Sequence, residues 1–96
     1  MCLIIHKPAG TAIPSVLIDA AVRFNSDGWG AMGFTASGRT IITRWKTTQA
    51  SDIRQFADTR IEDELVLHLR YRTRGAADVH NVQPFEIVPG IYLMHN

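Results

Sequence analysis

Short apolar stretches, each ended by glycine, proline, asparagine or aspartate, are the feature of this sequence that most limits its fold. Most of them have the length and the residue types of a strand, while two have apolar residues at helical spacing. Strands that follow one another through tight turns, with two short helices between them, indicate an α+β fold with mainly antiparallel sheets. The 96 residues allow a single domain, 1–96, with a modest core.

The expected elements follow from the turn residues that separate them. Apolar spacing predicts a helix over 15–24, capped by Ser15, and a second short helix over 51–60 with Asp52 in its first turn. A turn around Ser37 predicts a hairpin between two of the strands. The expected strands are 2–6, 31–37, 40–46, 64–72 and two short strands within 85–96.

Composition and charge exclude several classes of protein. Hydrophobic residues make up 46% and charged residues 20% of the chain, which is typical of a globular domain rather than a disordered one. A formal net charge of +1 gives no general attraction to nucleic acid or to an anionic membrane surface. No apolar run approaches a membrane span, and one cysteine excludes an intrachain disulfide. We therefore expect no nucleic-acid or membrane partner, and a cytoplasmic location.

The only cysteine, Cys2, directly follows Met1 and becomes the N-terminal residue if Met1 is removed. A thiolate is the reactive form of cysteine, and few thiols are ionised at neutral pH without help. The α-amine of an N-terminal cysteine can accept the thiol proton, directly or through water. The alternative is that Cys2 is a small buried apolar residue at the start of a strand.

Five short motifs point to one family when they are taken in order. They are MCLII at 1–5, NSDGWG at 25–30, HLRYRTRG at 68–75, NVQPF at 81–85 and LMHN at 93–96. Together they resemble the glutaminase domain of class II glutamine amidotransferases, which are N-terminal nucleophile hydrolases with a cysteine nucleophile. The resemblance spans the whole chain and implies an αββα sandwich with mainly antiparallel sheets. It also implies hydrolysis of the side-chain amide of glutamine, or of a γ-glutamyl amide, with release of ammonia and with no cofactor.

The same resemblance assigns roles to individual residues. Cys2 corresponds to the nucleophile that forms a γ-glutamyl thioester. Asn96 corresponds to the asparagine whose amide N–H stabilises the oxyanion, a contact typically worth about 3–4 kcal/mol of the barrier. Arg70 corresponds to the arginine that pairs with the substrate α-carboxylate, and a guanidinium suits that task because it binds carboxylates bidentately. Thr73 and Gly75 correspond to the loop that lines the glutamine pocket.

Three further residues, Asp27, Gly28 and Gly30, correspond to a turn that packs beneath the active site, and we expect them to be structural. The family pattern continues after Asn96 with a glycine that donates a second oxyanion N–H, and here that glycine is missing. The apolar strand within 85–96 also stops abruptly, whereas domains usually end in polar, exposed residues. We therefore expect an incomplete sandwich, the N-terminal portion of a glutaminase domain. A missing C-terminal half or a homo-oligomer would complete it.

Other patterns give alternatives. Arg70, Arg72 and Arg74 alternate in sequence, so they would share one strand face and could bind phosphate. Without aromatic stacking partners or a basic net charge, a solvated or ion-paired face is the better interpretation. The histidines show no zinc-ligand spacing, so we expect no metal, and we expect His68 and His95 to be packed and hydrogen-bonded. The alternative function is a non-catalytic or degenerate module that acts through protein association.

Overall fold

The structure is a computed structural model that describes residues 2–72 and 75–96. Its main sheet has four antiparallel strands: β1 (Leu3–Lys7), β2 (Trp29–Phe34), β3 (Thr40–Trp45) and β4 (Glu64–Leu69). Their spatial order is β1-β4-β2-β3, so β4 lies between the first two strands of the sequence. This arrangement confirms the α+β class with antiparallel sheets that the sequence predicts.

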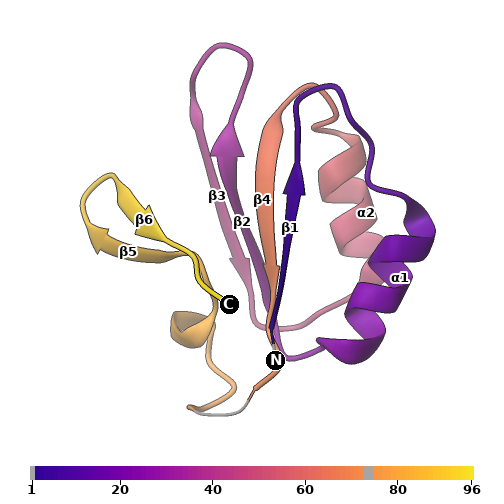
Figure 1. Cartoon of the computed structure of the whole chain (residues 1–96). Helices are drawn as coiled ribbons and strands as arrows, with labels where there is room; N and C mark the ends of the chain where they lie inside the picture. The colour runs from indigo at the N-terminus through magenta and orange to yellow at the C-terminus, as the bar shows by residue number, and fades with distance from the viewer. Residues whose placement is uncertain (1, 73–74) are drawn as a thin grey trace.

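Two helices, α1 (Ser15–Phe24) and α2 (Ala50–Asp58), lie against one face of the main sheet (Figure 1). A single 3₁₀ turn, η1 (Val79–Asn81), follows β4. The chain then forms a small hairpin from β5 (Phe85–Val88) and β6 (Ile91–Leu93), on the side of the sheet away from the helices (Figure 1). No helix in the described ranges is long and apolar enough to cross a membrane.

The core lies between the sheet and the helices. Successive residues of a strand point to opposite faces, and the odd-numbered residues of the sheet point to the helices. Trp29 and Leu67 are fully buried there, together with Ile18 of α1 and Ile53 of α2. Burying one side chain of this size contributes about 1.5–3 kcal/mol, so this layer supplies most of the apolar stabilisation. Trp29 also stacks on Trp45, with ring centroids 5.9 Å apart.

The even-numbered residues of β1 to β4 point to the other side of the sheet, which we call the open face. Most of this face is only partly covered, since Met32, Ile42 and Val66 are half-buried and Phe34 is 56% exposed. The hairpin of β5 and β6 covers part of it (Figure 1). The candidate functional residues lie at one end of the sheet, where β1 begins and β4 ends.

The ends of most other elements differ from the predicted ones by one to three residues, and two sequence predictions need further correction. Pro14, not Ser15, is the N-cap residue of α1, and no side chain in the described ranges caps this helix. The Pro14 carbonyl accepts the first two helical N–H bonds, from Leu17 and Ile18, so Ser15 lies within the first turn. The second correction concerns β4, which ends at Leu69 rather than continuing to residue 72, because the next residues bond to the segment before β2.

Candidate active site at one end of the sheet

The Cys2 thiol lies at the end of the sheet where β1 begins and β4 ends. Leu3 pairs with Leu69. Because the strands are antiparallel, Cys2, which precedes Leu3, and Arg70, which follows Leu69, lie at the same end of the two strands. Cys2 is partly buried, and its Sγ donates to the carbonyl oxygen of Tyr71 at 3.7 Å. The thiol is therefore held against the segment that leaves β4.

Arg70 is 6% exposed, and its backbone is fixed on both sides. Its N–H donates to the Gly28 carbonyl at 2.8 Å, and its carbonyl accepts from the Asp27 N–H at 2.9 Å. The guanidinium Nη1 donates to the Ala76 carbonyl at 3.1 Å. Gly75 has φ +82°, and a Cβ at this position would lie 3.4 Å from Arg70 Nη2, so the turn at 75–76 wraps closely around the guanidinium.

Asp27 and the two glycines that follow it support this end of the sheet. The Asp27 carboxylate accepts the Arg72 N–H at 2.7 Å, which turns the chain away from β4 after Leu69. Gly28 has φ +114°, and a Cβ there would lie 2.8 Å from the Val82 side chain. A Cβ at Gly30 would lie only 1.8 Å from the Gln83 carbonyl oxygen.

His68 is the most unusual group at this site. It is 1% exposed on the open face, and neither ring nitrogen has a hydrogen-bond partner in the described part of the chain. Burial is the main reason that the pKa of His68 falls from 6.5 to about 4, and the neighbouring His95 and Arg70 lower it further. A contact with the His95 backbone offsets this pKa decrease in part, although it does not reach hydrogen-bond geometry. His68 is therefore neutral near pH 7.

The segment after β6 returns to this end of the sheet. The His95 N–H donates to Gln83 Oε1 at 2.6 Å, and the His95 ring lies 6.2 Å from the ring of Phe85. Asn96 follows directly, is exposed, and its side-chain amide makes no hydrogen bond within the described ranges. An amide without a partner can donate to a bound group, provided that its backbone is held in place.

The structure brings some of the site residues predicted from the sequence to the same end of the sheet. Cys2, Arg70 and Gly75 lie at one end of the sheet, and Asn96 belongs to the segment that contacts His68 there. Thr73 lies outside the described residues, as does Arg74. Within the described ranges no three potential metal ligands come together.

Sequence reasoning missed the roles of two residues at this site. His68 is packed as expected, but it makes no side-chain hydrogen bond to the residues that the structure describes, because the His95 segment covers it without offering a well-placed acceptor or donor. The sequence signal for its place in the site was its alternation with the buried leucines of β4, since this alternation puts His68 on the same face as Arg70. Gln83 carries no such signal, because its contact with His95 depends on the path of the whole hairpin.

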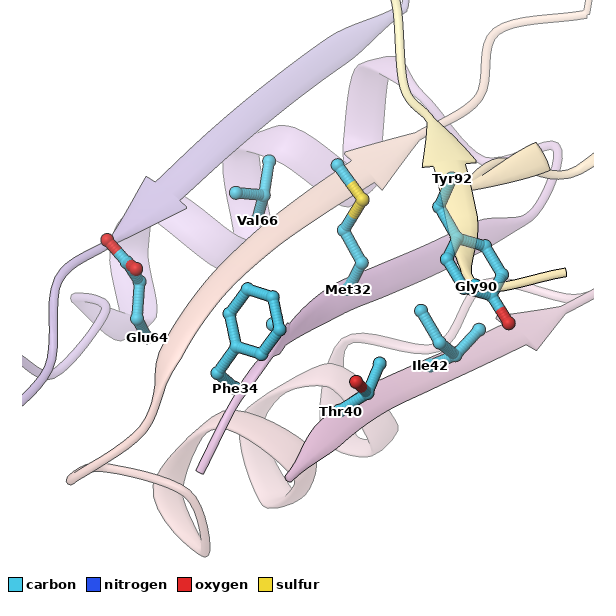
Figure 2. A pocket seen from close by; sticks show the side chains of 9 residues that line it. Met32, Phe34, Thr40, Ile42, Glu64, Val66, Gly90 and Tyr92 are labelled. Carbon is cyan, nitrogen blue, oxygen red and sulfur yellow. The ribbon is translucent and has the colours of Figure 1, made fainter. Parts of the chain in front are cut away.

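A separate apolar pocket of about 230 Å³ lies between the open face and the hairpin. Figure 2 shows Met32, Phe34 and Val66 projecting from the sheet toward it, with the Tyr92 ring above Ile42. Glu64, at the start of β4, marks one side of the pocket. Val66, the lining residue of β4 nearest to Arg70, precedes it by four positions, or roughly 13 Å of extended chain, so the pocket is distinct from the cysteine site.

Comparison of the chain with models of protein families, with curated protein sequences and with solved structures finds no match.

Proposed function

We propose that this chain hydrolyses the side-chain amide of glutamine, or of a related γ-glutamyl amide, with Cys2 as the nucleophile. The observation that carries the proposal is the position of the Cys2 thiol beside buried Arg70 at one end of the sheet. A nucleophile and a guanidinium at the same end of the sheet fit a substrate with a carboxylate at one end and an amide at the other. The motif resemblance supports the same substrate class.

The reaction would use an α-amine as its base. Once Met1 is removed, the α-amine of Cys2 takes the thiol proton, and the thiolate attacks the amide carbonyl carbon. The tetrahedral intermediate then breaks its C–N bond, and the leaving nitrogen departs as ammonia after it receives that proton. Water hydrolyses the γ-glutamyl thioester on Cys2 to release glutamate and restore the thiol. Asn96 is the proposed donor to the oxyanion in both steps.

The proposal includes a fold and a location. We propose that the main sheet and the helices are two layers of an αββα sandwich of the N-terminal nucleophile type, with the hairpin as part of the second sheet. The arrangement of two helices on one face and a hairpin on the other supports it. The mechanism needs a free thiol, which persists in a reducing compartment, so a cytoplasmic location is part of the proposal.

Replacement of the nucleophile tests the proposal. Cys2→Ala should reduce ammonia release from glutamine to the background rate, because no other group can form the thioester. Cys2 is only partly buried, so its truncation should change the free energy of unfolding by about 1 kcal/mol or less. Ammonia release is measured together with the mass of the N-terminus, which shows whether Met1 has been removed.

The matched labelling experiment uses a glutamine-analogue electrophile, followed by mapping of the adduct. Attachment at Cys2 is the expected result, and attachment at any other residue contradicts the mechanism. Ammonia release that survives Cys2→Ala contradicts the role of Cys2 as the nucleophile, whereas an unaltered chain that releases no ammonia would favour the second candidate, a non-catalytic module that acts through association. The exposed apolar side chains of the hairpin, among them Ile87, Ile91 and Leu93, are the observation behind that candidate.

A further inference from the structure

The segment after η1 is fixed firmly against the main sheet. Val82 and Pro84 are fully buried, and Gln83 between them is 6% exposed. The Gln83 carbonyl lies so close to β2 that a Cβ at Gly30 would come within 1.8 Å of its oxygen. The absence of a side chain at Gly30 is what allows this approach. The contact with the sheet therefore fixes the backbone of Gln83, from which its side chain extends.

The Gln83 side chain joins this fixed segment to the chain after β6. Its Oε1 accepts the His95 N–H at 2.6 Å, across twelve residues of sequence. The hairpin between them is held weakly, since Ile87 is 57% and Ile91 is 60% exposed. A hydrogen bond accepted by a buried amide oxygen at the base of an exposed hairpin is well placed to fix where the residue after the donor lies.

We infer that Gln83 is a positioning residue that holds the Asn96 amide where it can serve the Cys2 thiol, an inference that rests on the proposed function. Asn96 follows His95 directly and makes no side-chain hydrogen bond of its own in the described part of the chain. An oxyanion donor must lie within hydrogen-bond distance of the developing charge, and a misplacement of about 1 Å can reduce the rate about 10²-fold. The bond to His95 provides that constraint one residue away.

The first test removes the acceptor without changing the size of the side chain. Gln83→Met should lower kcat for glutamine by about 10–100-fold. KM should stay within about twofold, because Arg70, the proposed carboxylate contact, is not touched. Gln83→Glu keeps an oxygen that can accept the His95 N–H and should therefore restore most of kcat. Gln55→Met, on α2 on the other side of the sheet, is the matched control and should leave both constants unchanged.

A double-mutant cycle separates positioning from general stabilisation. If Gln83 acts through Asn96, Gln83→Met should lower kcat no further in an Asn96→Ala background. Independent, additive losses would overturn the inference. A loss of equal size in Gln83→Met and Gln83→Glu would also overturn it, because the acceptor would then not matter.

Amide hydrogen exchange distinguishes failure of this inference from failure of the proposed function. The His95 amide should exchange slowly in the unaltered chain and at least about tenfold faster in Gln83→Met, since its hydrogen bond is lost. If the unaltered chain releases no ammonia, the proposed function fails, and the catalytic role of Gln83 fails with it. The exchange result then decides whether the bond between Gln83 and His95 exists, and equal exchange in both proteins refutes it.

Discussion

Acid should destabilise the fold through one buried histidine, His68, more than through any exposed histidine of the chain. Burial and the neighbouring His95 and Arg70 lower the pKa of His68 to about 4 in the folded state, against 6.5 for an unperturbed histidine. Below pH 6.5 the unfolded chain therefore takes up a proton that the folded chain does not bind until about pH 4. Stability is lost as the pH falls through this window, and none of this contribution is lost above it.

The size of the effect follows from the difference between the two pKa values. A tenfold difference in proton affinity corresponds to about 1.4 kcal/mol, so the difference at His68 corresponds to about 3 kcal/mol between pH 7 and pH 4. Total stabilities of small domains are about 5–15 kcal/mol, so such a loss is easily measured. Urea unfolding at several pH values, followed by the fluorescence of buried Trp29, measures it.

The decisive comparison is with His68→Leu. Leucine keeps an apolar volume in the same site and removes two buried nitrogens without partners, so its free energy of unfolding at pH 7 should equal or exceed that of the unaltered chain. Between pH 7 and 4 this variant should lose about 3 kcal/mol less than the unaltered chain. His6→Gln, which removes an exposed histidine of the open face, is the matched control and should keep the full acid loss. Parallel pH profiles for the unaltered chain and His68→Leu would refute the reasoning.

Two further predictions concern close contacts and a buried charge. Gly30→Ala should lower the free energy of unfolding by at least about 3 kcal/mol, because its Cβ would overlap the Gln83 carbonyl. A Cβ at Gly38 meets no described atom within 4 Å, so Gly38→Ala should lower it by only about 1 kcal/mol, from backbone strain at φ +85°. Equal losses in urea unfolding would contradict this account. Lys7→Met should lower the free energy of unfolding by about 1–3 kcal/mol, because Lys7 is 1% exposed and its ammonium donates to three backbone carbonyls. Lys46 is exposed, so Lys46→Met should change the free energy of unfolding by less than about 0.5 kcal/mol. A Lys7→Met protein as stable as Lys46→Met would show that those carbonyls find other partners.

Local sequence signals predicted the elements well where one face of an element is buried. The helix predicted over 15–24 has those bounds in the structure, and the hairpin around Ser37 forms between β2 and β3. The prediction that β4 extends to residue 72 was wrong, because its alternating pattern continues past Leu69 while its partners do not. Asp27 accepts the Arg72 N–H instead, and a contact across that sequence distance leaves no local trace.

The candidate site was less accessible to sequence reasoning. Motifs pointed to Cys2 and Arg70, and strand pairing brings these two residues to one end of the sheet. The hydrogen bond between Gln83 and His95 and the burial of His68 both depend on how the hairpin returns to the sheet. Such returns are set by tertiary packing, for example by the space left at Gly30, rather than by periodicity.

The strand order has a consequence for how the chain is made. β1 lies at an edge of the sheet and its one neighbour is β4, so Leu3 has no sheet partner until Leu69 has been synthesised. At about 5–20 residues per second, the N-terminal strand remains unpaired for several seconds on the ribosome. The proposed mechanism needs Met1 to be trimmed, and this interval offers the trimming enzyme an extended N-terminus. In the proposed mechanism, strand pairing then brings Cys2 to the end of the sheet that carries Arg70.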